Sequence, residues 1–376
     1  MKVLQINKFY HPVIGGVETV VKQLAEGING GGGFTVDVLV CNDRYTTPGK
    51  TVSERINGVH VTKAASLGVL FSMPVSLAFI ALFRKVWRQY DVLHVHLPFP
   101  LAELALRLVR PGAKIVVTYH SDIVRQRLLS SMLSRLHAWV LSRADRIVVS
   151  NPNIVTTSPV LGPFKDKCVV IPFGVDTETF RPAPGAKDAV DRIRALYGMR
   201  IVLCVGRLVY YKGMEYLIRA MEGIDAVLVI IGEGPLRQAL AREVRGHGLD
   251  ARVVFLPYKP REELTAYYRA ASAFVLPSVY RSEAFGITII EAMACGLPVI
   301  STELGTGTSY ANRDGVTGYV VPPRDSGAIH AALERLLPDA ALSSTMGNAA
   351  VQRVRTDFTL TGMLDRYKGL YKELTR

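Results

Sequence analysis

Cysteine is scarce in this chain of 376 residues. The four cysteines, Cys41, Cys168, Cys204 and Cys295, lie far apart, without a C-x-x-C pair or a histidine at zinc-binding spacing. The spacing argues against a disulfide scaffold or a zinc site, and we expect reduced, buried thiols. The N-terminal segment MKVLQI lacks the basic, apolar and small-residue regions of a signal peptide. We therefore expect a cytoplasmic protein.

Acidic residues are outnumbered by basic ones. The chain has 45 Lys and Arg against 32 Asp and Glu, a formal net charge of +13, so anionic partners are attracted at long range. Charge alone does not distinguish nucleic acid, an acidic membrane surface or a phosphorylated substrate. We expect one positive face in the first half of the chain, where the basic residues cluster at Arg84, Lys85, Arg88, Arg107, Arg110, Lys114, Arg125, Arg127, Arg135, Arg143 and Arg146.

One long stretch has no charge at all. Residues 64–83, AASLGVLFSMPVSLAFIALF, reach the length of a membrane span, but Gly68, three serines and Pro74 interrupt the apolar run. We expect a buried helix that has Pro74 in its first turn and continues into Arg84 and Lys85. The alternative is a helix that rests on lipid headgroups beside the basic cluster.

Short apolar runs rich in β-branched residues alternate with amphipathic segments along nearly the whole chain. Such alternation is typical of parallel sheets with crossover helices, so the fold class is α/β. Both halves open with strand, loop, glycine and helix, as doubly wound sheets do. The expected strands are VLQI, VDVLV, VHVT, VLHVH, KIVVTY, RIVVS and CVVIP, and then IVLCVG, AVLVIIG, RVVFLP, AFVLP, PVIS and YVVP.

The length and this repetition predict two Rossmann-like domains, 1–175 and 176–357, with a ligand cleft between them. A stretch rich in proline, glycine and turn-forming residues, around residues 173–186, joins the two domains. Residues 358–376 form a last helix, whose apolar positions are Leu360, Met363, Leu364, Tyr367, Leu370 and Tyr371.

Two clusters in the second half carry residue types that bind a diphosphate. In the first, GRLVYYKG, Arg207 and Lys212 follow the strand IVLCVG. Cations at the carboxyl end of such a strand neutralise phosphate charge, and Arg does so with two parallel hydrogen bonds. The alternative is a pair of solvent-facing cations.

The second cluster is AFVLPSVYRSEAFGITIIEAMACGLPVIS, with Glu283 in a loop and Glu291 about one turn inside the next helix. We expect Glu291 to face the cleft and accept hydrogen bonds from vicinal hydroxyls, such as those of a ribose. We also expect Glu283 and Lys212 to lie on a cleft surface. Alternatively, the two carboxylates are a dipole partner and a solvated helix residue. The helix dipole favours a phosphate at the first N–H groups of the helix, those of Phe285, Gly286, Ile287 and Thr288.

Two signals in the first half are weaker. Gly15 and Gly16 come just before an expected helix, where the backbone can approach a phosphate without an intervening Cβ. His120 follows the strand KIVVTY, so its imidazole is placed to reach the cleft. A lone histidine is nevertheless more often structural.

Together these elements resemble the family 4 (group 1) retaining glycosyltransferases of GT-B fold. The resemblance covers nearly the whole chain, and it rests on Gly-Gly-x-Glu at Gly15, Arg207 with Lys212-Gly213, Gly-Glu-Gly-Pro at Gly232, and the Glu-x7-Glu element that begins at Glu283. It implies two Rossmann-like domains that face each other across a cleft. The first would bind the acceptor and the second the nucleotide sugar, while the last helix would cross back onto the first.

The resemblance also implies residue roles. Arg207 and Lys212 would hold the donor diphosphate, Glu291 the ribose, and Glu283 and His120 the donor sugar. The backbone of residues 285–288 would bind sugar hydroxyls and phosphate, and Gly16 would approach the diphosphate from the first domain. The reaction would retain the anomeric configuration without metal or cofactor. In agreement, the sequence has no Asp-x-Asp element of the kind used by metal-dependent glycosyltransferases.

The segment STELGTGTSYANRDGVTGYVVPPRD is similar to bacterial enzymes that add mannose or related hexoses to polysaccharides. We therefore expect transfer from GDP-mannose, with a UDP-hexose as the second choice of donor. The expected acceptor is a glycan or an oligosaccharide linked to polyprenyl diphosphate, in cell-envelope polysaccharide synthesis. Peripheral contact with an anionic membrane, at the inner face of the cell membrane, is a further expectation, and nucleic acid is not an expected partner.

Two functions of other classes stay open. An NAD-dependent oxidoreductase is one, because AVLVIIGEGPLRQAL resembles a Gly-x-Gly loop, although Arg237 occupies the third glycine position. A basic nucleotide-binding or nucleic-acid-binding protein without catalysis is the other, although no recognition helix, zinc pattern or stacking motif is present. A glycosidase with Glu283 and Glu291 as its two carboxylates leaves Arg207 and Lys212 without a role.

Overall fold

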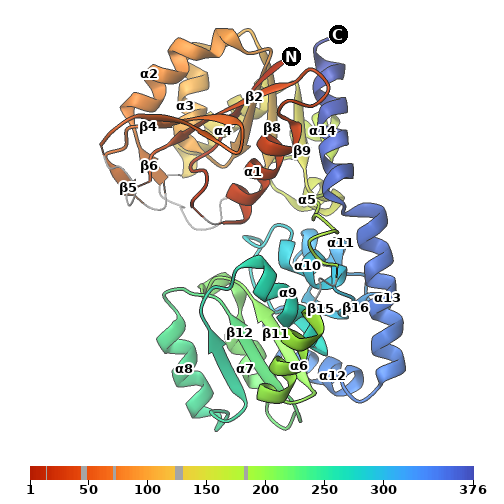
Figure 1. Ribbon diagram of the computed structural model, residues 1–376. Helices are drawn as coiled ribbons and strands as arrows, with labels where there is room; N and C mark the ends of the chain where they lie inside the picture. Colours follow the sequence, from red (N-terminus) through yellow and green to blue (C-terminus); the bar gives the residue numbers. More distant parts are fainter. Residues whose placement is uncertain (14, 44–48, 71–72, 123–129, 182–184) are drawn as a thin grey trace. The chain divides into compact units, whose positions relative to one another are not determined.

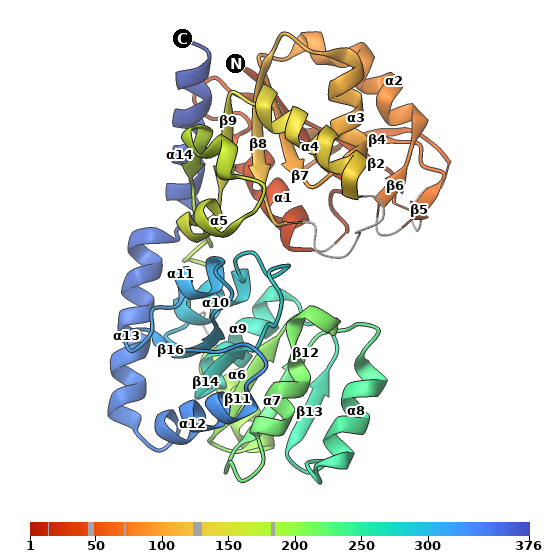
Figure 2. The ribbon, with the colours of Figure 1, turned by 180° about the vertical axis from the view of Figure 1, so that it is seen from behind.

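The computed structural model describes residues 1–13, 15–43, 49–70, 73–122, 130–181 and 185–376 (Figures 1 and 2). The chain divides into two compact units, Met1–Pro172 with Gly362–Arg376, and Phe173–Thr361. The predicted boundary lies three residues further along the chain. Arg125 and Arg127 of the basic cluster, residues 71–72 of the uncharged stretch and residues 182–184 of the predicted linker lie outside the described residues.

The first unit is built on an eight-stranded sheet of order β10-β9-β8-β7-β1-β2-β4-β3, parallel except for β3. The strand order reverses between β1 and β7, and doubly wound sheets bind ligands outside the carboxyl ends of strands at such a reversal. The strands are β1 (Lys2–Ile6), β2 (Thr35–Cys41), β3 (Val52–Ile56), β4 (Val59–Ala64), β7 (Val92–Leu97), β8 (Lys114–Tyr119), β9 (Arg146–Val149) and β10 (Cys168–Val170).

Helices cover both faces of this sheet, which explains why its central strands are apolar almost throughout. Side chains of α2, α3 and α4 share one apolar cluster with Leu93, Val95 and Leu97 of β7. The opposite face of β7 carries His94, which contacts Tyr371 of α14. The helices are α1 (Gly16–Ile28), α2 (Leu77–Val86), α3 (Pro100–Val109), α4 (Ser130–Arg143), α5 (Pro152–Thr157) and α14 (Leu360–Leu374), with 3-10 turns η1 (Trp87–Gln89) and η2 (Gly162–Lys167).

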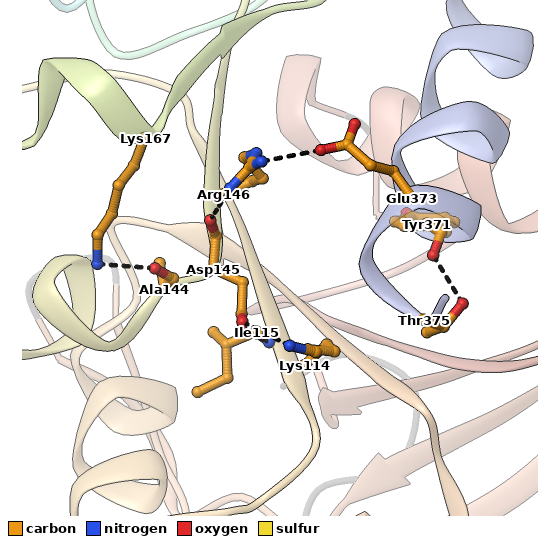
Figure 3. Close-up of polar contacts among 9 residues, drawn as sticks. All are labelled: Lys114, Ile115, Ala144, Asp145, Arg146, Lys167, Tyr371, Glu373 and Thr375. Atoms are coloured by element: carbon orange, nitrogen blue, oxygen red, sulfur yellow. Dashed lines mark hydrogen bonds and ion pairs between the residues drawn. The ribbon is translucent and has the colours of Figure 1, made fainter.

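The last helix, α14, packs on the first unit although it lies at the far end of the sequence. Its buried positions, at helical spacing, are five of the six predicted ones: Met363, Leu364, Tyr367, Leu370 and Tyr371. An ion pair of 2.8 Å joins Arg146 of β9 to Glu373 of the helix, beside the bond of 3.2 Å between Lys114 and Asp145 (Figure 3). Apolar burial and this surface pairing together hold the helix on the sheet.

The second unit contains a six-stranded, wholly parallel sheet of order β13-β12-β11-β14-β15-β16. Its strand order reverses between β11 and β14. The strands are β11 (Ile201–Val205), β12 (Val227–Ile231), β13 (Val253–Leu256), β14 (Ala273–Leu276), β15 (Val299–Thr302) and β16 (Gly318–Val321). The helices are α6 (Ala186–Tyr197), α7 (Met214–Ala220), α8 (Arg237–Gly246), α9 (Arg261–Ala270), α10 (Ile287–Ala294), α11 (Gly307–Ala311), α12 (Ser326–Leu336) and α13 (Ala340–Asp357), with the 3-10 turn η3 (Tyr210–Lys212).

The uncharged stretch of residues 64–83 does not form the predicted helix from Pro74. It forms an antiparallel hairpin, β5 (Gly68–Leu70) and β6 (Met73–Val75), in which Pro74 pairs with Val69, before α2 begins. The prediction for Pro74 was wrong because Ser76 starts the helix: its Oγ accepts a hydrogen bond of 3.0 Å from the Phe79 N–H. Among the described residues, no helix is long and apolar enough to span a membrane.

We predict that Gly232→Ala destabilises the second unit by about 3 kcal/mol. Gly232 follows β12 with φ +146, and a Cβ there would overlap the backbone carbonyl oxygen of Gly206. Differential scanning calorimetry measures the change in Tm. The matched control is Gly246→Ala at the end of α8, where a Cβ meets no atom within 4 Å. Equal Tm values for the two variants would contradict the assignment of strain to Gly232.

Candidate active site

Two loops of the second unit meet at the carboxyl ends of β11 and β14. These strands are neighbours in the sheet, so the loops that follow them share one edge. The Val279 N–H donates a hydrogen bond of 2.8 Å to the Tyr211 carbonyl, which ties the loops together. Gly213, with φ +62, allows this approach, because a Cβ there would overlap the Pro277 carbonyl. Lys212 and Glu283 are thereby brought side by side.

The Lys212 ammonium and the Glu283 carboxylate form a buried ion pair with Nζ and Oε2 2.5 Å apart. Each residue is 8% exposed, so neither Lys212 nor Glu283 is a solvent-facing side chain. Burial by itself lowers the pKa of Lys212, but the Glu283 carboxylate, with a smaller contribution from Tyr211, outweighs burial, and the pKa lies above its usual value. Ser278 Oγ donates a second hydrogen bond, of 3.1 Å, to the same Oε2. Oε1 of Glu283 makes no hydrogen bond within the described part of the chain.

Arg207 differs from Lys212 in that its side chain is exposed and forms no hydrogen bond or ion pair with the described residues. The backbone beside it is held by the Gly-Glu-Gly-Pro segment: the Leu208 N–H donates to the Glu233 carbonyl at 2.8 Å. A Cβ on Gly234 would overlap Leu208. Because protein backbone occupies the close approach to Gly232 and Gly234, the Gly-x-Gly loop of a nicotinamide-binding site is not present here.

The start of α10 presents unused hydrogen-bond donors. Backbone N–H groups of Phe285, Gly286, Ile287 and Thr288 donate to no acceptor among the described residues, as expected for the first turn of a helix. The hydroxyl of Thr288 is also buried, and it has no hydrogen-bond partner within the same described ranges. The Phe285 ring packs edge-on against Phe173 and Phe358, which fixes the position of this turn. Such a turn, with its dipole, favours an anion.

Glu291 lies one turn further along α10 and is half-buried. Its Oε2 accepts a hydrogen bond of 3.0 Å from the Tyr268 hydroxyl of α9. Burial raises the pKa of Glu291, and Arg261 and the Tyr268 bond oppose that rise. Glu283 and Glu291 thus lie in different surroundings, one paired with a lysine and the other with a tyrosine.

In the first unit, the two predicted glycines open α1. Gly15 is its N-cap with extended backbone, and Gly16 is its first residue. A Cβ on Gly15 would meet the Glu18 carboxylate, whereas one on Gly16 would meet no atom within 4 Å. Ile14, just before them, lies outside the described residues. Gly16 is exposed at the carboxyl end of β1, where the strand order reverses.

His120 is buried directly after β8, and its imidazole is part of a polar network beneath α14. Nε2 of His120 lies 2.9 Å from Nδ1 of His96, and the two rings stack. Nε2 of His96 lies 2.8 Å from Oε1 of Gln5. Nδ1 of His94 lies 2.6 Å from the Tyr371 hydroxyl, and Nε2 of the same ring lies 2.7 Å from the Thr118 hydroxyl.

The three histidines of this network are neutral at physiological pH. Burial lowers the pKa of His94 to about 3, and the nearby His120 ring adds to the effect. The pKa of His120 also falls to about 3, because of burial and then the Lys8 ammonium. Burial also lowers the pKa of His96 well below its usual value, and the His94 and His120 rings contribute to this shift.

Sequence reasoning singled out His120 and missed Gln5, His94, His96 and Thr118. The signal was present, because these polar residues interrupt otherwise apolar strands, and His94 and His96 are two apart and so share one face of β7. Registers such as Gln5 beside His94 and His96 beside Thr118 then bring them together. The cluster forms only when the strands pair, and the order in which they pair cannot be read from the sequence.

Both halves of the chain match known families. Residues 190–353 match the glycosyl transferases group 1, and residues 14–179 match the glycosyltransferase family 4. The O-antigen chain mannosyltransferase C of Escherichia coli is 36% identical over 376 residues, which cover 100% of this chain and 99% of that one. The D-rhamnosyltransferase WbpZ of Pseudomonas aeruginosa is 38% identical over 361 residues, 96% of this chain and 92% of the relative.

Among solved structures, the sucrose-phosphate synthase of Thermosynechococcus elongatus superposes with a TM-score of 0.82. The sequences are 24% identical, and the match covers 99% of this chain and 98% of that one. At this identity the likeness concerns the fold, which is the GT-B arrangement of two Rossmann-like units.

We predict that the first unit loses stability on mild acidification. The unfolded chain binds a proton at each of His94, His96 and His120 near the ordinary histidine pKa, whereas the folded chain does not, so stability falls as pH drops below about 6.5. The slope is about 1.4 kcal/mol per pH unit for each histidine. Both tryptophans, Trp87 and Trp139, lie in this unit, so tryptophan fluorescence in urea titrations at pH 7 and pH 5.5 measures it. Equal midpoints would contradict the prediction.

Proposed function

The chain belongs to the family 4, group 1 glycosyltransferases, and we propose that it transfers mannose from GDP-mannose to a glycan or lipid-linked acceptor with retention of anomeric configuration. The observation that carries this proposal is the β11–β14 edge, where N–H groups and an arginine without partners in the described part of the chain lie at the strand reversal. Mannose as the sugar is supported by the full-length similarity to a mannosyltransferase. A UDP-hexose is the second candidate donor.

The diphosphate is the leaving group, and its negative charge rises as the sugar departs. The first N–H groups of α10 would bind one phosphate, and the exposed Arg207 guanidinium would take two oxygens of the diphosphate in parallel hydrogen bonds. Lys212 is paired with Glu283 and would add positive potential from its buried position. The helix N–H groups and Lys212 are fixed before the reaction, so they would stabilise the charge that develops in the transition state without reorganising.

The two glutamates would grip the two ends of the donor. Oε1 of Glu283 is left to accept a hydrogen bond from a sugar hydroxyl, since Lys212 and Ser278 both bind Oε2. Glu291 would accept from the ribose through its remaining oxygen, while Tyr268 holds the other. In the first unit, Gly16 would approach the diphosphate, and His120 would contact the donor sugar.

In the proposed reaction, the bond between the anomeric carbon and the diphosphate oxygen breaks as the acceptor oxygen attacks on the same face. The acceptor proton passes to the departing phosphate oxygen, so no separate base and no metal is required. Product anomeric configuration, read by NMR, and turnover in EDTA test these two points. Inversion, or loss of turnover that returns with a divalent cation, would reject this mechanism.

The acceptor is proposed to reach the first unit from an anionic lipid surface. Large apolar side chains are exposed along one segment, the β5–β6 hairpin and the start of α2, with Leu67 82% and Leu77 76% exposed. A pocket of about 470 Å³ opens among the same hairpin residues. The exposed cations of this region continue along α2 and η1 at Arg84, Lys85 and Arg88. Apolar insertion beside cations is typical of proteins that bind anionic membranes peripherally.

We predict that Arg207→Ala lowers kcat/KM by about a hundredfold or more, because one charge contact to the leaving group is lost. The Tm should stay within about 1 °C, since the side chain is exposed and unpaired among the described residues. Turnover is measured with GDP-mannose, UDP-hexoses and a GDP-deoxyhexose. Arg242→Ala, an exposed cation on α8, is the matched control. Unchanged activity in Arg207→Ala would remove this residue from the site.

We predict that the double variant Leu67→Asp, Leu70→Asp no longer floats with vesicles of phosphatidylcholine and phosphatidylglycerol, whereas the wild type does. Leu67 and Leu70, 82% and 59% exposed, are the most exposed apolar side chains before α2 begins, among the described residues of this segment. The control variant Leu196→Asp, Met199→Asp changes two side chains of the second unit that are each 70% exposed. Recovery of the wild type only in the unbound fraction at low salt would contradict membrane contact, as would equal loss in both variants.

A further inference from the structure

The Glu283 loop, residues 278–283, is held by the end of β15 and the loop that follows it. Because β14 and β15 pair in parallel, the loops after them leave the sheet at the same edge. The Thr302 hydroxyl donates a hydrogen bond to the Ser278 carbonyl at the start of the Glu283 loop. The Thr306 hydroxyl donates one of 2.8 Å to the Glu283 carbonyl at its end. The two threonines therefore fix the backbone at both ends of this loop.

The direction of these two hydrogen bonds is not in doubt. A backbone carbonyl accepts and cannot donate, so the proton in each bond belongs to the threonine hydroxyl. Thr302 and Thr306 are both completely buried, at 0% exposure. Bulk water does not reach either hydroxyl, so solvent cannot replace the bond that is lost when a hydroxyl is removed.

The side chains at the two ends of the Glu283 loop bind each other. Ser278 Oγ donates a hydrogen bond of 3.1 Å to Oε2 of Glu283, and the Lys212 ammonium pairs with the same oxygen. The position of the carboxylate therefore depends on how far apart the two ends of the loop lie. Because Thr302 and Thr306 set that separation, they also determine the direction in which Oε1 of Glu283 points.

The start of α10 is held by a different contact. The Gly307 N–H donates a hydrogen bond of 2.8 Å to the Ala284 carbonyl, and a Cβ on Gly307 would overlap the Cα of Phe285. This contact uses backbone atoms only, so substitutions of the side chains of Thr302 and Thr306 leave it in place. The N–H groups that are proposed to bind the diphosphate should then be preserved when a threonine hydroxyl is removed.

We propose that Thr302 and Thr306 are positioning residues for Glu283, and that they aim its Oε1 at a hydroxyl of the donor sugar. The contact with the sugar rests on the proposed function, whereas the hold on the Glu283 loop does not depend on it. The proposal divides the second unit into two sets of groups. The threonines act through Glu283 on the sugar, and Arg207 and the start of α10 act on the diphosphate.

Valine and serine separate the hydroxyl from the rest of the threonine side chain. Valine keeps the branched shape without the donor, and serine keeps the donor without the methyl group. We expect Thr306→Val to lower kcat/KM with GDP-mannose by about tenfold, and Thr306→Ser to stay within about threefold of the wild type. The Kd for GDP, which has no sugar, should be unchanged in both variants. Thr302→Val and Thr302→Ser repeat the test at the other end of the loop if Thr306→Val does not fold.

Donors that lack one hydroxyl distinguish positioning from a loss of stability. In a panel of monodeoxy GDP-mannose analogues, the wild type should use the analogue without the hydroxyl bound by Oε1 about tenfold less well than GDP-mannose. In Thr306→Val that penalty should shrink to about twofold, and the penalties at the other hydroxyls should stay the same. A purely structural role would lower the turnover of all donors by one common factor, and that result would overturn the proposal.

Thr265→Val is the matched control. Thr265 is 8% exposed, and its hydroxyl donates to the Arg261 carbonyl within α9 at 2.8 Å, the same type and length of bond as at Thr306. The substitution should lower the Tm while leaving kcat/KM and the deoxy penalties as in the wild type. Equal changes in the deoxy penalties of Thr265→Val and Thr306→Val would also count against positioning.

Hydrogen exchange tests the hold on the loop without any substrate. The Glu283 N–H donates to the Tyr280 carbonyl at 3.0 Å inside the loop. In the full-length protein it should exchange about tenfold faster in Thr306→Val, but at the wild-type rate in Thr306→Ser and Thr265→Val. An unchanged rate in Thr306→Val would show that this threonine does not hold the loop. If the rate rises but the wild type uses no nucleotide sugar, the sugar contact is overturned with the proposed function, and only the hold on the loop stands.

Discussion

The reversal of strand order between β11 and β14 is the constraint on which the candidate site depends. Neighbouring parallel strands end at the same edge of a sheet. The loop after β11, with Arg207 and Lys212, must therefore lie beside the loop after β14, with Glu283. This proximity has two results. Lys212 and Glu283 form a buried ion pair, and the Arg207 side chain and the start of α10 keep donors that can bind an anion. The same geometry thus buries the Lys212–Glu283 pair and leaves the Arg207 side chain exposed.

A buried ion pair is often no more stabilising than apolar side chains of similar volume, because desolvation costs several kcal/mol for each ion. Its retention here is understandable if the carboxylate must be fixed with one oxygen open. Lys212 and Ser278 both approach Oε2 of Glu283, so the rotamer is locked and Oε1 has a defined direction. Removing one partner would leave the other charge buried alone, at a cost of about 3–5 kcal/mol. Stability and positioning are therefore coupled at this pair, but not at Arg207.

The sequence predicted the elements well and their side-chain environments less well. All thirteen expected strands are present, because each is a short β-branched run bounded by turn formers, and five of the six apolar positions expected in the last helix are buried. The pairing of β5 with β6 was missed, since Pro74 is compatible with both a helix start and an edge strand. The burial of Lys212 was missed because it depends on Glu283, which lies 71 positions away and is brought close only by strand order. The histidine network was missed for the same reason.

The network also explains why the chain must return to its first unit. Gln5 and His94 lie on the face of the sheet that α14 covers, and Tyr371 of that helix supplies the hydroxyl that both of them bind. Without the helix, two polar side chains of central strands would lose their partner, at about 1–3 kcal/mol for each unsatisfied group, in addition to the apolar surface that α14 buries. Residues 1–172 therefore do not specify a complete folding unit. The last helix therefore completes the polar network of the first unit as well as its apolar core.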